Sequence, residues 1–437
     1  MALGSSVLMS RFKRTMQAGP KEVWMLTTEL TGERAGSFRQ ERWSRALLTR
    51  GFIVKVFELR GALRIQEFQF DSVEQFIKFR QDKRNKKVTS SLREGAFAKL
   101  LRKLKHHFIV DLYFPNVIFL VFRLLFLLTI RKRNVWIMAS SPPFSLALAG
   151  AIAKTICQRK ACFVVDMRDA WAKHPGIAPS SRIRQKVEKF VLSTADLIAT
   201  VSNGLAGEFR VSANVEVATV YNVAAHFDNS SNPVHGIKEP ALIDRSRIQI
   251  TFTGSLPPGH FDVETFANAL KIARQRDSTK VDGMQFVFAG ACSELEPWLD
   301  QKNIEAKDAV FLGHVSHDLA KILQARSDIL LFFAFKGKGN HGVVSTKLFE
   351  YIASNTPILP LSVCEHGDVD FLLKHICGQS LRLHTVSEFA DAILDICSHR
   401  GGRLPRLTNQ AALHSLHQAY DEFLTTIESV QSSYRST

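Results

Sequence analysis

The segment 341–353, HGVVSTKLFEYIA, contains the residue types and spacing best suited to binding a charged ligand. The pattern predicts a helix that begins near Ser345 or Thr346, either of which can serve as its cap. A helix start at the carboxyl edge of a parallel sheet offers free N–H groups and a positive dipole end, which suit a diphosphate. Lys347 adds positive charge, and Glu350 lies on the same helical face, where a carboxylate can accept both hydroxyls of a ribose. The alternative is an ion pair on an ordinary surface helix.

A second candidate for phosphate binding is the segment 252–256, FTGSL. It follows a predicted strand. Gly254 would let a phosphate oxygen approach the backbone closely, and Ser255 has a hydroxyl to donate. Because any tight turn can place Gly-Ser after a strand, this pattern is less specific than the first.

Two carboxylates bracket an arginine in the segment 164–171, VVDMRDAW. Asp166 and Asp169 stand on either side of Arg168, in a loop expected at the end of a strand. In open α/β sheets such loops border the ligand cleft. A carboxylate beside an arginine stays ionised and can orient a sugar hydroxyl. The alternative is a salt-bridged loop that only braces the cleft.

Two further loops of the first half complete the set of candidate residues. The segment 140–145, SSPPFS, places Ser140 and Ser141 before two prolines that fix the backbone. It could shape an acceptor pocket or simply end a strand. Gly36 lies in a loop expected after the first strand.

Short apolar runs that alternate with helical patterns are expected to position these residues. Runs of this kind, followed by polar or Gly-containing turns, are typical of parallel strands buried between two layers of helices. The alternation stops at 226–247, which is polar and contains two prolines, and then restarts. The sequence therefore predicts two α/β domains with doubly wound sheets, at 1–225 and 248–437, joined by a linker at 226–247. The final helix could pack back on the first domain.

Composition excludes several classes of protein. The chain has 437 residues, of which 46% are hydrophobic and 22% charged, so a mostly disordered chain is excluded. The six cysteines form no CxxC pair and no zinc spacing, which argues for a reducing cytoplasm. Residues 1–230 carry 37 basic and 18 acidic residues, net +19, whereas residues 231–437 carry 20 and 23, net −3. This asymmetry suggests that the first domain faces an anionic surface.

The basic charge is most concentrated in the stretch 80–105, with ten Lys or Arg against Asp82 and Glu94. Its second part predicts a basic amphipathic helix that would bind an anionic membrane; the alternative is a solvated face. No nucleic-acid motif accompanies the charge, so nucleic acid is not expected. The apolar segment 117–130 has 14 residues including Arg123, too few to span a bilayer. We expect a buried helix there, with partial insertion into a bilayer as the alternative.

Taken together, six segments resemble a known family of enzymes. They are similar to the GT-B glycosyltransferases of the large retaining family 4, above all to bacterial members that build surface or exported polysaccharides. The likeness covers about residues 22–430 and is carried by VVDMRDAW, LSTADLIATVSNGL, VYNVAAHFD, ITFTGSL, VFLGHV and STKLFEYIASNTPIL.

The resemblance implies two Rossmann-like domains that face each other across a cleft. It implies a nucleotide-sugar donor on the second domain and a lipid-linked or saccharide acceptor on the first. No DxD motif stands in a plausible donor loop, so no metal and no other cofactor are expected. The expected location is the cytoplasm, with peripheral attachment to the inner face of the cell membrane.

Individual roles follow from the resemblance residue by residue. Glu350 matches the glutamate that holds the donor ribose, and Lys347 matches part of the diphosphate cradle. The whole donor set is Gly254, Ser255, His314, Gly342, Ser345, Lys347 and Glu350. The acceptor side comprises Gly36, Ser140, Ser141 and Arg168, and the candidate catalytic residues are Asp169, Asp166 and Lys347.

The chain also departs from the family pattern. Gly342 stands where many relatives carry the first of two glutamates, and Arg168 stands where many carry a histidine. Ser255 and His260 replace an arginine and a lysine, so phosphate charge is expected from other bases, namely Lys336, Lys338 or Lys347. The identity of a catalytic base is left open. The expected route is front-face attack, in which the leaving diphosphate takes the acceptor's proton. A nucleotide-sugar epimerase of the same fold and a non-catalytic partner subunit are the alternatives.

Overall fold

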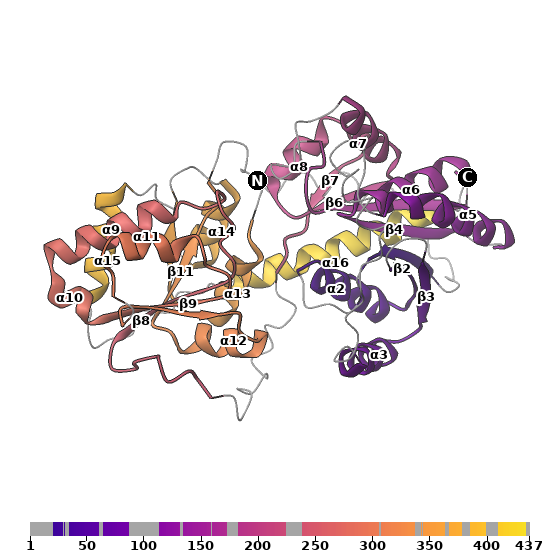
Figure 1. Ribbon diagram of the computed structural model, residues 1–437. Coiled ribbons are helices and arrows are strands. Elements are labelled where there is room, and N and C mark those ends of the chain that lie inside the picture. The colour runs from indigo at the N-terminus through magenta and orange to yellow at the C-terminus, as the bar shows by residue number, and fades with distance from the viewer. Residues whose placement is uncertain are drawn as a thin grey trace. The chain divides into compact units, whose positions relative to one another are not determined.

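The computed structural model describes residues 21–433 except 29, 31–34, 61–63, 87–112, 132–133, 159, 173–181, 224–237, 306, 337–341, 343, 363–366, 378–384 and 399–409. The chain forms two compact units (Figure 1). The first comprises Met1–Tyr221 together with His417–Thr437, and the second comprises Asn222–Leu416.

The first unit is built on a seven-stranded sheet with the order β3-β2-β1-β4-β5-β6-β7. All neighbouring strands are parallel except β3, which pairs with β2 in the antiparallel direction. The strand order reverses next to β1, where β2 and β4 flank it, as in doubly wound sheets. The strands are β1 (Lys21–Thr27), β2 (Phe52–Leu59), β3 (Ile65–Phe70), β4 (Val135–Ser141), β5 (Ala161–Met167), β6 (Leu197–Thr200) and β7 (Val217–Thr219).

Helices cover both faces of this sheet. Alternate side chains along a strand are buried in two different hydrophobic clusters, one on each face. Trp24 of β1 belongs to the hydrophobic cluster on one face, whereas its neighbours Val23 and Met25 belong to the cluster on the other face. The first cluster is formed with α5 (Phe114–Ile130), α6 (Phe144–Ile156), α7 (Arg182–Thr194) and α8 (Asn203–Arg210). The second is formed with α2 (Ala35–Thr49), α3 (Val73–Lys86) and α16 (Gln410–Ser433).

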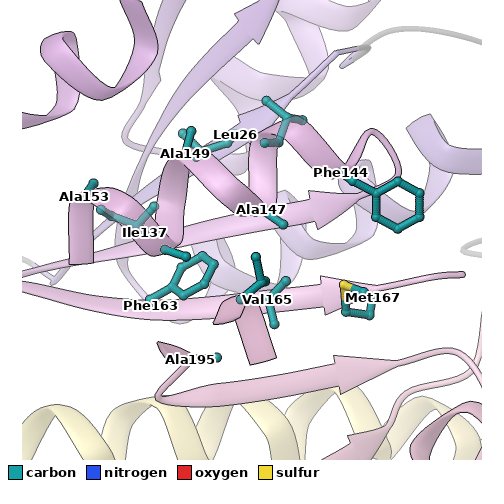
Figure 2. Close-up of a cluster of buried hydrophobic side chains, with 14 of the residues drawn as sticks. Leu26, Ile137, Phe144, Ala147, Ala149, Ala153, Phe163, Val165, Met167 and Ala195 are labelled. Carbon is teal, nitrogen blue, oxygen red and sulfur yellow. The ribbon is translucent and has the colours of Figure 1, made fainter. Parts of the chain in front are cut away.

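Figure 2 shows part of the first cluster, where α6 lies over β4 and β5. The buried residues of this cluster include Ala147 and Ala149 on the helix and Ile137 and Phe163 on the strands. Small side chains such as those of alanine allow a helix to pack close to large strand residues at interior density. This packing fixes the carboxyl ends of β4 and β5, from which the first-unit candidate residues project.

The second unit is built on a parallel five-stranded sheet with the order β10-β9-β8-β11-β12. Its strands are β8 (Ile248–Thr253), β9 (Met284–Ala289), β10 (Ala309–Gly313), β11 (Ile329–Phe333) and β12 (Ile358–Leu361). One face packs Phe286 and Phe288 against helices α9 and α15, and the other packs Val287 and Ala289 against Leu323 of α12. The helices are α9 (Val263–Arg276), α10 (Ser278–Asp282), α11 (Leu295–Gln301), α12 (His317–Arg326), α13 (Thr346–Ser354), α14 (Gly367–Cys377) and α15 (Val386–Ser398). The two predicted α/β domains with parallel sheets are confirmed.

The expected linker is only partly separate from the second unit. Residues 224–237 lie outside the described residues. Ile243, however, is buried in a cluster with Val287 and Ala289, and the backbone N–H of Asp244 donates to Gln285 at 2.9 Å. The expected linker at 226–247 was therefore too long, because its last part packs on the second sheet.

The final helix, α16, contributes side chains to the first unit. Tyr420, Phe423, Leu424 and Ile427 are buried in the cluster that contains Trp43. Charged contacts add to this packing, since the Lys21 Nζ lies 2.6 Å from Glu428 Oε1. The chain thus returns to its first sheet after it has completed the second.

The helix expected within the apolar segment 117–130 is present as α5, but only one of its faces is buried. Val117, Leu120 and Leu124 are buried, whereas Phe122 and Phe126 are 69% and 57% exposed. Among the described residues, no helix combines the length and apolar composition needed to cross a membrane.

Most of the basic stretch 80–105 lies outside the described residues, which resume at 113. Of its described part, Arg80 is buried and forms an ion pair with Glu41, and Lys83 pairs with Glu58. The prediction of a basic surface is wrong for Arg80, because its charge is neutralised inside the unit.

Candidate active site

Two glycine turns touch at the carboxyl edge of the second sheet. The backbone N–H of Gly254, just after β8, donates to the carbonyl of Ala289 at the end of β9 at 2.9 Å. Gly254 has φ +153° and Gly290 has φ +131°, a region that favours glycine. A Cβ at Gly290 would stand 1.8 Å from the Gly254 carbonyl oxygen, so only glycine allows this approach. The turn in FTGSL is therefore held in shape by its neighbour.

The first turn of α13 lies against the same place. Ser345 caps the helix, since its side chain accepts from the N–H of Lys347 at 3.3 Å, which confirms the predicted cap. The Lys347 stem crosses the turn: a Cβ at Gly254 would lie 3.6 Å from both Cγ and Cε of that lysine. Lys347 Nζ then pairs with Glu350 Oε2 at 2.7 Å, and the two side chains are 28% and 21% exposed. The pair expected on one helical face is thus formed and half-buried.

A buried polar chain holds Glu350 from behind. Gln324, which is 2% exposed in the last turns of α12, donates through Nε2 to Glu350 Oε2 at 3.2 Å and to Thr253 Oγ1 at 2.7 Å. The Tyr351 hydroxyl accepts from the Thr253 N–H at 2.8 Å. The end of β8, α12 and α13 are therefore linked by hydrogen bonds at the point where Glu350 emerges.

His317, the first residue of α12, adds a titratable group near this carboxylate. Burial lowers its pKa from the ordinary histidine value, the charges of Lys321 and Lys347 lower it further, and Glu350 acts in the opposite direction. The net shift is downward, so the imidazole is mostly neutral near pH 7. A neutral ring can donate one hydrogen bond and accept another.

The remaining donor candidates are placed less closely. Gly342 is buried in a turn before α13, and Ser255 and His314 are exposed, the latter directly after β10. Lys336 is exposed, and its N–H donates to the carbonyl of His260 at 2.9 Å. Lys338 lies outside the described residues. The structure therefore brings Gly254, Ser345, Lys347 and Glu350 into one site and leaves Ser255 and His314 at its exposed border.

This arrangement is chemically suited to an anionic ligand with hydroxyl groups. The capped helix start and the glycine turn supply backbone N–H groups, and Lys347 supplies a positive charge. Glu350 supplies a charged acceptor for hydroxyls. Among the described residues, no three His, Cys, Asp or Glu side chains gather as a bound metal ion would require.

In the first unit, Asp166 lies in β5 and not in the loop expected there, and it belongs to a closed buried network. Arg39, 3% exposed on α2, binds it through Nε at 2.8 Å and through Nη2 at 2.6 Å, and the Trp43 indole donates to it at 3.1 Å. Burial acts to lower the pKa of Arg39, but the Asp166 carboxylate and the Tyr420 hydroxyl raise it above the ordinary value. Asp166 is fully buried. Its carboxylate is thus engaged in bracing the unit, a placement that does not suit contact with a substrate.

Arg168 and Asp169, which follow β5, are less buried than Asp166. Asp169 is half-buried and makes no hydrogen bond or ion pair within the described part of the chain, although its charge acts on Arg168. Arg168 donates to the carbonyl of Pro142, and its N–H donates to the Ser141 carbonyl at 2.8 Å. Burial lowers the pKa of Arg168 despite the two nearby aspartates. The carboxyl ends of β4 and β5 are therefore joined, and Asp169, in the loop after β5, has a carboxylate without a partner among the described residues.

The serines and Gly36 complete the acceptor-side set. The Ser140 hydroxyl donates to Asp166 at 3.3 Å, and the Ser141 hydroxyl is buried without a partner among the described residues. Gly36 lies in the first turn of α2, so the prediction of a loop at this position is wrong. Helix α2 begins at Ala35, about one turn before its expected start at Phe38.

Sequence reasoning missed several residues of the second-unit site. Gly290, Gln324 and His317 were not singled out, and neither was Thr253. Gly290 follows an apolar strand as Gly254 does, a signal that the two FxGxx turns share. Gln324 and His317 carry no local signal, since each resembles an ordinary polar position on a surface helix.

Comparison by sequence finds no family and no curated protein that matches the chain. Solved structures do match. An α,α-trehalose 6-phosphate synthase from Burkholderia multivorans superposes with a TM-score of 0.61 at 12% identity, covering 95% of this chain and 100% of the other. The chain has the GT-B fold.

Other GT-B proteins match over the same extent. A sucrose-phosphate synthase from Thermosynechococcus elongatus gives a TM-score of 0.56 at 12% identity, covering 93% of this chain and 100% of the other. A structure titled putative UDP-N-acetylglucosamine 2-epimerase, from Listeria monocytogenes, gives a TM-score of 0.53 at 9% identity, covering 95% of this chain and 98% of the other. At these identities the likeness concerns the fold, so function must be argued from the site.

Proposed function

We propose that this chain is a glycosyltransferase that moves a sugar from a nucleotide-diphosphate donor to a lipid-linked or saccharide acceptor, with retention of the anomeric configuration. The observation that carries the proposal is the cluster of Gly254, Lys347 and Glu350 at the start of α13. The lysine beside the glycine turn is suited to bind a diphosphate. The carboxylate that pairs with this lysine is suited to bind the ribose next to that diphosphate.

The proposed donor site works through charge and geometry. The diphosphate lies against the α13 start, and Lys347 moves from Glu350 toward the phosphate oxygens as negative charge grows on the leaving group. Glu350, still held by Gln324, then accepts the ribose hydroxyls. Positioning and charge stabilisation supply the rate, with the leaving diphosphate as proton acceptor. This route needs no metal.

The acceptor side of the proposal rests on the first unit. Asp169 is the candidate that orients the acceptor hydroxyl, because its carboxylate is free of partners among the described residues. Bacterial polysaccharide synthesis at the inner face of the cell membrane is the setting that we propose for the reaction.

The donor is identified by unfolding the protein in the presence of different nucleotide-sugars. A donor present at 100 times its dissociation constant stabilises the folded protein by about 2.7 kcal/mol, enough to raise the melting temperature measurably. The matching nucleoside diphosphate should also stabilise it, and a sugar phosphate without the nucleotide should not. If no nucleotide-sugar raises the melting temperature, the proposed donor site is wrong.

An epimerase is the second candidate function, favoured by the likeness of fold to the 2-epimerase. Incubation with the identified donor and no acceptor separates the two. An epimerase converts the sugar of the nucleotide-sugar, whereas a transferase leaves it intact or releases free sugar slowly. Binding of donor without turnover on any acceptor would instead support a non-catalytic partner subunit, a role consistent with Gly342 in place of a glutamate.

A further inference from the structure

Helix α5 carries a row of large apolar side chains that no other described part of the chain covers. Phe114, Ile118, Phe122, Phe126 and Ile130 follow each other at intervals of four residues, and each is between 48% and 69% exposed. Side chains four apart form one ridge along a helix. We call these five residues the outer ridge of α5.

The exposure of the outer ridge follows from the way in which α5 packs on the first unit. The opposite face of α5 is buried in the core of the first unit through Val117, Leu120, Leu124 and Leu128, so the orientation of the helix is fixed. Phe119, beside the ridge, is 55% exposed as well. Folded proteins rarely leave so many adjacent large apolar side chains in water, and such patches mark contact with a partner or a membrane.

The surroundings of the ridge are basic. Helix α6 packs beside α5, and α7 packs beside α6, on the same face of the first sheet (Figure 1). Neither α5 nor α6 contains an acidic residue. On α7, Arg182, Lys186 and Lys189 are exposed together with the apolar Ile183 and Phe190.

Helix α7 carries four basic residues and one acidic residue, Glu188, so its net charge is positive. Glu188 accepts hydrogen bonds from the backbone N–H groups of Trp171 and Ala172, at 2.6 and 3.0 Å. Arg123, the one charged residue of α5, pairs with Glu67 at the flank of the ridge, 2.6 Å away.

We propose that the outer ridge of α5 inserts into the interface of an anionic lipid bilayer, with the bases of α7 lying on its headgroups. A helix that lies in the plane of the interface buries its apolar face near the acyl boundary and needs no length to span. Exposed lysines and arginines around it gain from the negative surface potential. A second copy of the chain fits less well, because an isologous contact would bring the same uncompensated bases together.

Binding of the full-length protein to vesicles tests this surface. The protein is sedimented with vesicles of phosphatidylcholine alone and of phosphatidylcholine mixed with phosphatidylglycerol, at low and high salt. We expect binding to the mixed vesicles that persists in part at high salt, because apolar burial is not screened. The double variant Phe122→Ser with Phe126→Ser should bind about tenfold or more weakly at both salt concentrations.

Two further variants separate charge from apolar burial. Lys186→Gln with Lys189→Gln should weaken binding at low salt only. Val211→Ser with Leu242→Ser removes two exposed apolar side chains elsewhere, which are 87% and 66% exposed, and should bind like wild type. Unchanged melting temperatures show that every variant is folded.

Several results would overturn the proposal. The proposal is contradicted if the wild-type protein does not bind anionic vesicles. It is also contradicted if the Phe122→Ser, Phe126→Ser variant binds them like wild type. A wild-type dimer in solution that this variant dissociates, with no vesicle binding, assigns the ridge to a second copy instead. The proposal does not rest on glycosyl transfer, because stabilisation by a nucleotide-sugar is measured separately and should be the same in the ridge variant.

Discussion

The two aspartates around Arg168 differ in their surroundings, although they are three residues apart. Asp166 is fully buried and bound by Arg39, whereas Asp169 is half-buried without a partner among the described residues. A buried ion pair that loses one member leaves an uncompensated charge. A free carboxylate at a loop can be replaced with little effect on folding.

Replacing each aspartate by asparagine should therefore have different effects. Asp166→Asn should lower the free energy of unfolding by about 3 kcal/mol or more, since the Arg39 charge is left buried. Asp169→Asn should change it by less than about 0.5 kcal/mol and should reduce turnover with donor affinity unchanged. Urea unfolding measures the free energy of unfolding of each variant, and kinetics with the identified donor measure its turnover and donor affinity. Full activity in a folded Asp169→Asn variant would make the loop purely structural.

Glu350→Gln should weaken donor binding by about 1–3 kcal/mol, because a charged acceptor of two hydroxyl groups becomes neutral. The fold should survive, since Gln324 can still hydrogen-bond to the new side chain. Calorimetric titration with the donor measures the loss. Glu264→Gln, an exposed carboxylate in the first turn of α9, is the matched control and should bind the donor like wild type. Equal affinity in both variants would remove Glu350 from the site.

Lys347→Met should reduce turnover more than donor affinity, because growing negative charge on the leaving diphosphate needs the ammonium most in the transition state. Methionine keeps most of the apolar stem that lies across Gly254. Comparison of kcat with KM decides the role of the lysine. A raised KM with an unchanged kcat would mean that the lysine binds the donor ground state only.

At the scale of secondary-structure elements, the site depends on contact between the turns that follow β8 and β9. Gly290 lets the β9 turn touch the Gly254 carbonyl, and Gln324 of α12 ties the end of β8 to α13. The donor residues are thus positioned by three elements that are far apart in the sequence.

Gly290→Ala should disturb this contact, since its Cβ overlaps the Gly254 carbonyl and its φ of +131° is unfavourable for alanine. We expect a loss of about 1–3 kcal/mol or more in the free energy of unfolding, and weaker donor binding. Gly367→Ala, at the start of α14 where a Cβ meets nothing within 4 Å, is the control. Thermal unfolding with and without donor measures both effects. A Gly290→Ala variant with normal donor affinity would show that the turn does not shape the site.

At the scale of the whole molecule, the chain crosses from the second unit back to the first through α16. The middle of this helix supplies Tyr420 to Arg39 and Leu424 to the core around Trp43. The core of the first unit therefore includes residues of α16, which follow the second unit in the sequence.

Leu424→Ala should destabilise the first unit by about 2–5 kcal/mol through the cavity that it leaves. Glu422→Ala, an exposed position on the same helix, should have an effect within about 0.5 kcal/mol. Calorimetry in the presence of the donor reports each unit, because the donor stabilises the second. If Leu424→Ala leaves the melting profile unchanged, α16 is not part of the first core.

Local patterns were sufficient to predict the α/β architecture and the helix start at α13. Alternating apolar runs reflect burial on both faces of a parallel sheet, and the cap at Ser345 depends on neighbouring residues alone. The pairing of Lys347 with Glu350 could also be predicted from the sequence, because residues three apart on a helix share a face.

Contacts distant in the sequence could not be found in this way. The engagement of Asp166 by Arg39, 127 residues away, is invisible in a loop that reads as two exposed acids. The same holds for Gln324 behind Glu350, for Gly290 against Gly254, and for the face of α5 that is left uncovered. Periodicity shows which residues of an element can share a face, but burial and pairing depend on what the rest of the chain brings to that face.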